Sequence, residues 1–237
     1  MILIAVGLNL PYIIIQRYNR PRIIRFLAHG SRKKNAEIGN SKASIDEYHP
    51  YRILFISADD TGHGHKSITE ALRQQITRLD PNVQISVVDG FSLGKKMMRA
   101  IGRLYNPLVV NLPALWGLLY RAGNHSVRLI NTFVSKNIKI KLIRCLEQVR
   151  PDVIVSVHGV FVGSVLNILE KEQLDIPVIP FIADLDNVSS LWADKRSKYT
   201  LCPSEEAKQI MHSLEIPEEK LRLVGFPVRE DFCDSIP

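Results

Sequence analysis

Short apolar runs that alternate with segments of helical periodicity constrain the fold more than any other feature of this sequence. The runs cover residues 52–58, 83–89, 151–158 and 176–184, and two shorter ones follow at 199–203 and 221–225. Continuous apolar runs of this length are typical of strands that are buried on both faces of a parallel sheet. Strands that alternate with helices predict an α/β chain with a Rossmann-like, doubly wound parallel sheet.

The segments between these runs favour helices. Apolar residues recur at helical spacing from Ile68 until Pro81, and a further helix is expected over about 160–172. Residues 92–150 are expected to be mostly helical, with breaks at Pro107 and Pro113. Ser204 is a capping residue in front of a helix over 204–215.

The chain divides into an N-terminal extension and one larger domain. Its 237 residues are long for one domain and short for two. Residues 1–50 form an apolar, basic extension and a polar linker, and residues 51–225 are expected to form the Rossmann-like domain. As a helix, the first fifteen residues would span ~22 Å, short of a ~30 Å hydrocarbon core. Two interpretations stay open for them: association with a membrane, and loose packing against the domain.

Charge is concentrated in the middle of the chain. The net charge is +7, and residues 93–150 carry eleven Lys or Arg against one acid, Glu147. Lys95, Lys96, Arg99 and Arg103 recur on one side of a helix, and an apolar stretch with Trp116 and Tyr120 follows. Such a pattern is suited to an anionic membrane surface. The alternative is an ordinary solvated helix face. Nucleic acid is not expected as a partner, because the basic residues interleave with aliphatic ones and no binding motif is present.

Three polar clusters follow the predicted strands, at residues 59–65, 156–158 and 184–187. In parallel sheets, ligands bind beyond the carboxyl ends of the strands. His158 and Asp184 are therefore candidate residues of a cleft there.

The turn from Ser57 to His65 contains two glycines and joins the first strand to a helix. Gly62 and Gly64 permit a sharp turn and a close approach of the backbone to a ligand, and the helix that follows favours an anion such as a diphosphate. Thr61 is part of the same loop. His65, at the start of the helix, is a candidate general base. Alternatively, the glycines serve only the conformation of the turn, and the turn binds no ligand.

Two other chemistries fit this turn less well. The spacing of a Walker loop is absent. Asp59, Asp60, His63 and His65 could instead ligate a metal in a hydrolase. No further cluster of acids and histidines supports that site, and the cysteines, Cys145, Cys202 and Cys233, are too far apart in the sequence for a zinc motif. We therefore expect neither a metal nor a cofactor.

Residues 51–233 resemble the N-terminal half of the monogalactosyldiacylglycerol synthase and processive diacylglycerol glucosyltransferase family. Six segments carry the resemblance: Gly62-x-Gly64-His65, Pro113-Ala114-Leu115-Trp116 with Tyr120, Pro151-Asp152 leading to His158, Asp184 with Trp192, Pro203-Ser204-Glu205-Glu206-Ala207, and Gly225-Phe226-Pro227-Val228. The resemblance implies one half of a GT-B fold, the acceptor-binding half. It implies that His65 deprotonates a hydroxyl of diacylglycerol or a related lipid, and that the glycine loop faces the diphosphate of a UDP-sugar.

The sequence departs from that family in three ways. Ser189 stands where the family often has a histidine, and Lys198 stands where it often has an acid. Residues 226–237 are expected to begin the connection to a donor-binding domain, which the sequence given does not contain. A truncated, non-catalytic module that binds membranes is therefore an alternative to the glycosyltransferase. In either case the expected location is the cytoplasmic face of a membrane, with peripheral attachment or an N-terminal anchor.

Overall fold

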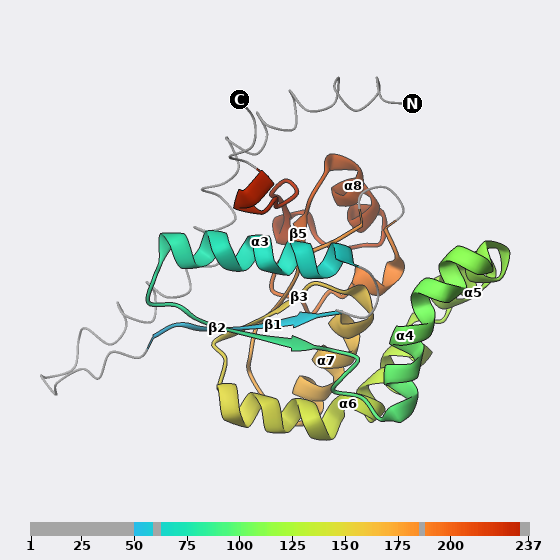
Figure 1. Ribbon diagram of the computed structural model, residues 1–237, viewed down its shortest axis with the longest axis horizontal. Helices are drawn as coiled ribbons and strands as arrows, with labels where there is room; N and C mark the ends of the chain where they lie inside the picture. The colour runs from blue at the N-terminus through green and yellow to red at the C-terminus, as the bar shows by residue number, and fades with distance from the viewer. Residues whose placement is uncertain (1–49, 59–62, 185–187, 233–237) are drawn as a thin grey trace, which may run out of the picture.

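The computed structural model describes residues 50–58, 63–184 and 188–232 (Figure 1). Its strands are β1 (Arg52–Ser57), β2 (Gln84–Asp89), β3 (Val153–Ser156), β4 (Val178–Pro180), β5 (Thr200–Cys202) and β6 (Leu221–Leu223). Its helices are α3 (His63–Leu79), α4 (Lys96–Asn111), α5 (Pro113–His125), α6 (Val127–Val149), α7 (Gly159–Lys171) and α8 (Glu205–Ser213), with 3-10 helices η2 (Ser190–Trp192), η3 (Glu218–Lys220) and η4 (Glu230–Phe232). The expectations for residues 1–49 lie outside the described residues.

The strands form parallel sheets, as the sequence predicts. Four of them pair in the order β2-β1-β3-β4, and β5 pairs with β6. All of these pairs are parallel. A bridge between Phe181 and Leu201 joins the two sheets, and the Ile182 amide donates to the Leu201 carbonyl at 3.0 Å. The predicted α/β class with a Rossmann-like parallel sheet is confirmed.

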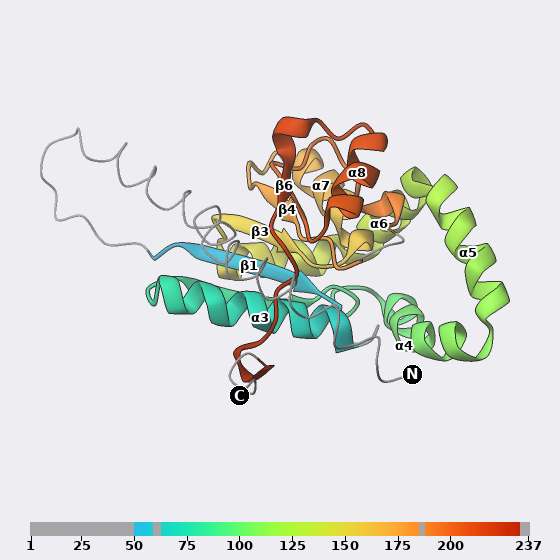
Figure 2. The ribbon, with the colours of Figure 1, turned by 90° about the horizontal axis from the view of Figure 1, so that it is seen from above.

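Helices cover both faces of the larger sheet. Helix α3 lies on one face, and α6 and α7 lie on the other, while α8 packs on β5 and β6 (Figures 1 and 2). Successive residues of β1 point to opposite faces. Ile53 and Phe55 therefore pack in the cluster with α3, whereas Leu54 and Ile56 pack in the cluster with α6 and α7. A strand that contributes to two cores has no polar face, which is why the run at 52–58 is apolar throughout.

The helical segment over 92–150 differs from its prediction at one proline. Helix α4 runs through Pro107, so the expected break there is wrong. Proline removes one backbone donor. Here it lies in an exposed part of α4, and the next turn is fastened by Asn111, whose side-chain amide donates to the Pro107 carbonyl at 2.9 Å. The expected break at Pro113 is confirmed. Pro113 begins α5, where its missing N–H has no helical partner to lose.

Two other boundaries are set by local chemistry. Strand β4 is shorter than the run at 176–184, since it ends at Pro180, which has no N–H for a ladder. Helix α8 begins after Ser204, whose hydroxyl accepts the Ala207 amide at 3.1 Å. The predicted capping role of Ser204 is therefore confirmed.

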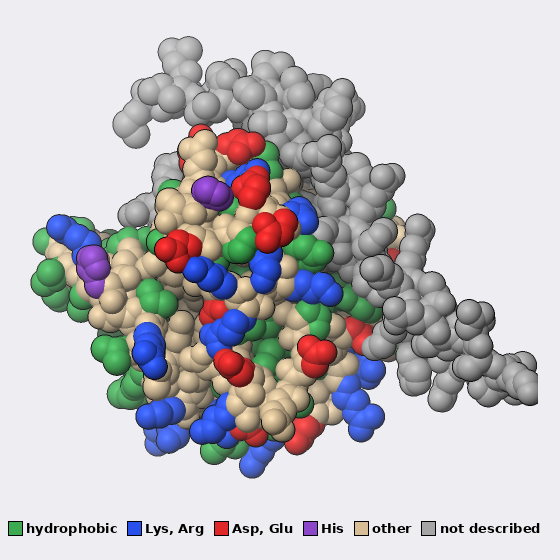
Figure 3. Space-filling view, turned by 180° about the vertical axis from the view of Figure 1, so that it is seen from behind, with side chains coloured by type: hydrophobic (Ala, Val, Ile, Leu, Met, Phe, Trp, Pro, Cys, Tyr) green, Lys and Arg blue, Asp and Glu red, His purple; other side chains and the backbone are tan. Residues whose placement is uncertain are grey.

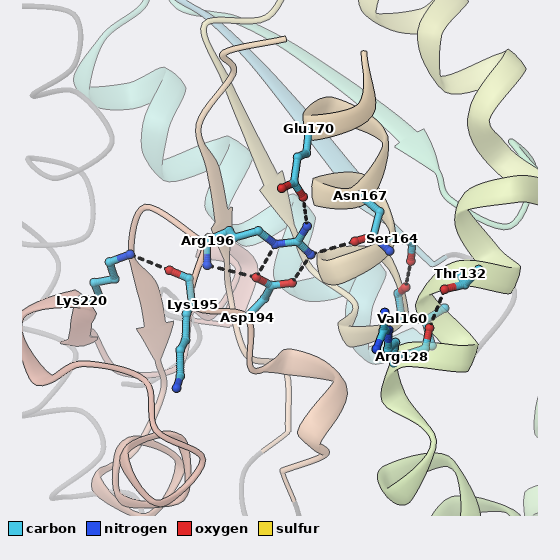
Figure 4. A network of polar contacts seen from close by, with 10 residues as sticks. All are labelled: Arg128, Thr132, Val160, Ser164, Asn167, Glu170, Asp194, Lys195, Arg196 and Lys220. Carbon is cyan, nitrogen blue, oxygen red and sulfur yellow. Dashed lines mark hydrogen bonds and ion pairs between the residues drawn. The ribbon is translucent and has the colours of Figure 1, made fainter. Parts of the chain in front are cut away.

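An ion-pair network fastens α7 to the segment before β5 (Figure 4). Arg196 donates to Asp194, to Glu170 at 2.6 Å and to Asn167 at 2.9 Å. The hydrogen bond to Asp194 most of all, and the bond to Glu170, raise the pKa of the Arg196 guanidinium. Arg196 also lines a cavity of about 460 Å³ with Pro177 and Val178, at the amino end of β4. This end of the strand is opposite to the end where the site is expected.

The chain turns back towards α3 after β6 (Figure 2). Gly225 makes the turn with a φ of 79°, a conformation that glycine adopts without a steric penalty. The side chain of Gln75, on α3, then donates to the Val228 carbonyl at 3.4 Å. The segment that follows the last strand is thereby fastened to the second half of α3.

Candidate active site

Three predicted residues meet at the carboxyl ends of the central strands. His65 lies in the first turn of α3, His158 lies directly before α7, and Asp184 follows β4. The rings of His65 and His158 have centroids 4.7 Å apart. Asp184 acts electrostatically on His65. Residues that are far apart in the sequence therefore form one polar cluster.

The tautomer of His65 is set by a backbone carbonyl. Its Nδ1 lies 2.7 Å from the Val157 oxygen. A carbonyl can only accept, so Nδ1 carries the proton and the lone pair of a neutral ring is on Nε2. Burial lowers the pKa of His65, while the bond to Val157 and the charge of Asp184 oppose that shift. His65 is therefore a half-buried neutral imidazole with a basic nitrogen, the form that a general base requires.

His158 caps helix α7. The Val160 amide donates to its Nδ1 at 3.3 Å, which puts the proton of the neutral ring on Nε2. The ring contacts Phe91 and Phe161, at centroid distances of 5.6 and 5.5 Å. Burial and the neighbouring His65 keep the pKa of His158 well below its ordinary value. His158 is therefore a neutral hydrogen-bond donor beside the base.

Short polar side chains fix the backbone around both histidines. The Thr69 hydroxyl donates to the His65 carbonyl at 2.8 Å and lies 3.2 Å from the Ser57 hydroxyl. The Ser156 hydroxyl donates to the His158 carbonyl at 3.0 Å. Ser57, Thr69 and Ser156 are buried. The start of α3 and the start of α7 are thus both bonded to the ends of strands.

Asp184 is oriented by a tryptophan that the sequence did not single out as a site residue. The Trp192 indole donates to Asp184 Oδ2 at 2.7 Å, and this ring is only 2% exposed. Gly159 provides the space for it, because a Cβ there would lie 3.2–3.3 Å from three atoms of the ring. The eight-residue spacing of Asp184 and Trp192 was the only sign in the sequence that these two residues are related. Their contact could not be seen from spacing alone.

Tyr120 faces the same cluster from helix α5. Its hydroxyl hydrogen-bonds with Asn124 and Ser189, and Asp184 acts on it electrostatically. Burial is the largest cause that raises the pKa of Tyr120. Trp116, one turn earlier, lies 6.1 Å from the Tyr120 ring, and both are half-buried. Asn124 was missed by sequence reasoning, although it stands one helical turn after Tyr120.

The four predicted basic residues lie together at the start of α4. Lys95 precedes the helix, Lys96, Arg99 and Arg103 are on it, and all four are exposed. The structure adds a set of exposed apolar side chains on α4, α5 and α6 and their connection: Met97, Ile101, Leu104, Val110, Leu112, Leu115, Leu118, Leu119, Leu129, Phe133 and Ile140. No residue of α5 is buried. Hydrophobic and basic side chains gather along this projecting edge (Figure 3, left).

The glycine loop is only partly described. Thr61 and Gly62 lie outside the described residues, as do Asp59 and Asp60 of the metal hypothesis. Gly64 is exposed, and a Cβ there would contact nothing within 4 Å, so packing does not require a glycine at this position. Within residues 50–58, 63–184 and 188–232, no group of three His, Cys, Asp or Glu could hold a metal ion. In the same ranges, no helix is long and apolar enough to cross a bilayer.

Comparison with known proteins identifies relatives of the chain. It is 27% identical over 199 residues to the chloroplastic monogalactosyldiacylglycerol synthase of Spinacia oleracea, and the match covers 81% of this chain and 38% of that protein. It is also 27% identical over 203 residues to a probable chloroplastic monogalactosyldiacylglycerol synthase of Nicotiana tabacum, over 81% of this chain and 37% of that protein. This chain therefore spans less than two fifths of the length of these relatives.

A solved structure and a family model also resemble the chain. The apo form of the lipopolysaccharide outer core galactosyltransferase WaaB aligns with a TM-score of 0.43 and 14% identity, over 76% of this chain and 46% of that chain. The family model of monogalactosyldiacylglycerol (MGDG) synthase matches residues 65–228, the region that contains His65, His158 and Asp184. The chain belongs to the MGDG synthase family.

Proposed function

We propose that this chain is the acceptor-binding half of a glycosyltransferase, one that moves a hexose from a UDP-sugar to diacylglycerol or a related membrane lipid. Membership of the MGDG synthase family supports glycolipid synthesis as the general activity. The observation that carries the proposal for this chain is the geometry of His65, whose Nδ1 is held by the Val157 carbonyl while Nε2 keeps its lone pair.

In this proposal, His65 acts as a general base. The oxygen of the lipid hydroxyl attacks the anomeric carbon of the sugar, and its proton passes to Nε2 of His65. The bond from the anomeric carbon to the diphosphate breaks, and the diphosphate leaves with the electron pair. Displacement from the opposite side inverts the anomeric centre. The lowered pKa of His65 favours the neutral, proton-accepting ring before the attack.

The acceptor surface would be the projecting edge of α4, α5 and α6. Each basic side chain near an anionic membrane contributes about 1 kcal/mol. Burial of one leucine side chain contributes about 1.5–3 kcal/mol. Lys95, Lys96, Arg99 and Arg103 can therefore bind lipid headgroups while exposed residues such as Leu115 and Leu118 enter the apolar layer. A lipid hydroxyl near the headgroups would then approach Tyr120 and the cluster behind it.

Donor binding belongs to a second domain in this proposal. The relatives are more than twice as long as the part that this chain matches, and a GT-B enzyme closes a cleft between two Rossmann-like halves. The loop with Thr61, Gly62 and Gly64 would face the donor diphosphate across that cleft. We propose a peripheral position on the membrane surface, and no nucleic acid as a partner.

The test compares two histidines in a protein that joins this chain to a donor domain of the family. His65→Ala should lower turnover of UDP-galactose or UDP-glucose with diacylglycerol by ~10²–10⁴-fold, the contribution of a general base. His212→Ala, on the exposed face of α8, is the matched control and should leave turnover unchanged. Equal activity of the two variants would refute the role of His65. The 237-residue chain by itself should show no transfer, and robust transfer would contradict the assignment of the donor site to another domain.

A further inference from the structure

Helix α5 is fastened to the site by a small set of hydrogen bonds at its C-terminal end. No residue of α5 is buried, so hydrophobic packing does little to hold it. Its last turn carries Asn124, and the segment that faces Asn124 is the start of η2. The contact between these two segments joins the exposed helix to the polar cluster around His65.

Asn124 accepts hydrogen bonds from two consecutive serines. The Ser189 hydroxyl donates to its Oδ1 at 2.6 Å, and the Ser190 amide donates to the same oxygen at 3.2 Å. The Ser190 hydroxyl lies 2.9 Å from the Asn124 carbonyl and 3.2 Å from Oδ1. Tyr120 also hydrogen-bonds with Asn124 and Ser189. A single amide side chain is thus the common partner of both segments.

The segment that Asn124 holds continues into the site. Trp192 is the last residue of η2, and its indole donates to Asp184 at 2.7 Å. Asp184 acts electrostatically on both Tyr120 and His65. Hydrogen bonds therefore run from α5 through η2 to the Asp184–Trp192 pair, and the charge of Asp184 acts from there on the candidate base.

We propose that Asn124 is a positioning residue, which holds helix α5 against η2 and so keeps the Asp184–Trp192 pair beside His65. The lipid-facing role of α5 rests on the function proposed above, but the contact itself does not. When lipid engages α5, any shift of its last turn would be passed through Asn124 to η2. The environment of the base would then depend on whether an acceptor surface is bound.

The first measurement needs neither lipid nor activity. The chain has two tryptophans, so Trp116→Phe leaves Trp192 as the only one. In that background, Asn124→Ala should increase acrylamide quenching of Trp192 fluorescence, because η2 loses its hydrogen bonds to α5. Asn124→Asp keeps the accepting oxygens and should restore the low quenching. Asn137→Ala is the matched control and should change nothing, since the Asn137 amide donates to the Phe133 carbonyl within its own helix, α6, at 2.8 Å.

The second measurement follows His65 by NMR titration, with the signal assigned from His65→Gln. The charged or titratable groups beside His65 are Asp184 and His158. The charge of Asp184 raises the pKa of His65. If Asn124→Ala lets Asp184 move away, the pKa of His65 should fall. Asp184→Asn, which removes that charge, is the reference for the direction of the change. If Asn124→Ala does not fold, Ser190→Ala removes bonds of the same contact from the other side. A folded variant of either residue with unchanged Trp192 quenching and unchanged His65 titration would overturn the proposal.

A third measurement separates this inference from the proposed function. Vesicles of phosphatidylcholine, phosphatidylglycerol and diacylglycerol should change Trp192 emission in the Trp116→Phe protein, and Asn124→Ala should abolish that response. If vesicles bind but the emission of Trp192 does not change, the coupling of α5 to η2 through Asn124 is refuted, while the proposed membrane surface is retained. If the chain binds no vesicles while Asn124→Ala still alters Trp192 and His65 in solution, the positioning role stands and the proposed membrane surface is refuted.

Discussion

At the scale of single residues, two histidines with opposite hydrogen-bonding patterns define the site. His65 donates through Nδ1 to Val157, and His158 accepts through Nδ1 from Val160. One ring therefore offers a lone pair on Nε2, and the other offers a proton. Burial lowers the pKa of both. Before the reaction the pair is uncharged, and it offers one nitrogen that can accept a proton and one N–H that can donate a hydrogen bond; His65 becomes positively charged when it takes up the proton.

The lowered pKa of His65 predicts the pH dependence of catalysis. The general base must be neutral, so kcat/KM should rise with pH through the pKa of His65 and then reach a plateau. Because that pKa lies below the ordinary value of about 6.5, the plateau should persist into mildly acidic solution. The measurement is a pH profile of the protein completed with a donor domain. If kcat/KM does not decrease in acidic solution, and decreases only as the pH rises above 7, this role of His65 is contradicted.

The same shifts predict how stability depends on pH. The unfolded chain takes up protons at His158 below pH ~6.5, whereas the folded chain resists them, so the free energy of unfolding should fall as the solution is acidified. His158→Asn keeps a capping side chain and removes the titration. Urea denaturation at about pH 7 and pH 5 should show a smaller loss of stability for His158→Asn than for the unmodified chain. His212→Asn, exposed on α8, should behave like the unmodified chain, and an equal pH dependence in all three would refute the prediction.

At the scale of elements, the aromatic packing beside the site depends on a glycine after β2. A Cβ on Gly90 would lie 2.3–2.6 Å from three atoms of the Phe161 ring, which is fully buried. That ring cannot move without displacing Phe91, at a centroid distance of 5.1 Å, and His158. The start of α7 is thereby packed against the end of β2.

This packing predicts contrasting effects of two glycine substitutions. Gly90→Ala should destabilise the fold by about 1–3 kcal/mol, because overpacking forces the Phe161 ring to shift. Gly117→Ala is the control. A Cβ there contacts nothing within 4 Å, and Gly117 is inside α5, so the substitution should be neutral or stabilise by up to about 1 kcal/mol. Thermal or urea unfolding checks both. Equal stabilities would show that Phe161 accommodates the methyl group.

At the scale of the whole molecule, the two ends of the sheet have different roles. The carboxyl end gathers His65, His158 and Asp184, and the projecting edge of α4, α5 and α6 stands beside it (Figures 1 and 2). At the amino end of β4, the Arg196 network joins α7 to the segment before β5 (Figure 4). In the function proposed above, one edge of such a molecule lies on a membrane and the carboxyl end of its sheet faces a second domain.

The projecting edge predicts salt-sensitive binding to membranes. A chain that begins at Tyr48 should sediment with vesicles that contain phosphatidylglycerol and much less with pure phosphatidylcholine. Because screening shortens to ~3 Å at 1 M salt, the anionic component should fade as salt rises. Changing Lys95, Lys96, Arg99 and Arg103 to glutamine should remove most of that component, whereas Trp116→Ala should weaken the salt-insensitive remainder.

The control for this prediction changes as many cations elsewhere. Lys171, Lys195, Lys198 and Lys208 lie outside α4, α5 and α6, and their substitution by glutamine should leave binding nearly unchanged. If the two sets of substitutions weaken binding equally, net charge and not the projecting edge would explain it. If only the full-length chain binds, the N-terminal segment is the anchor and the acceptor surface proposed here is wrong.

The sequence by itself determined the class of fold, and it predicted the histidines of the candidate site. Buried strands are recognisable because a sheet covered on both faces leaves no polar side on β1 (Arg52–Ser57), and a helix cap such as Ser204 acts within its own turn. His65 could be singled out because it stands where a strand turns into a helix. These features depend on neighbours along the chain, which the order of residues specifies directly.

Only the tertiary structure decided which residues meet. The Val157 carbonyl that fixes His65, the indole of Trp192 on Asp184, and the serines on Asn124 come from separate elements. Their contacts depend on how strands and helices pack, and a pattern along the chain carries no record of distances between elements. Pro107 shows the same limit. A local rule predicted a break, but the turn of α4 around Pro107 keeps the helix continuous, because one lost backbone bond costs less than the contacts that the rest of the helix retains.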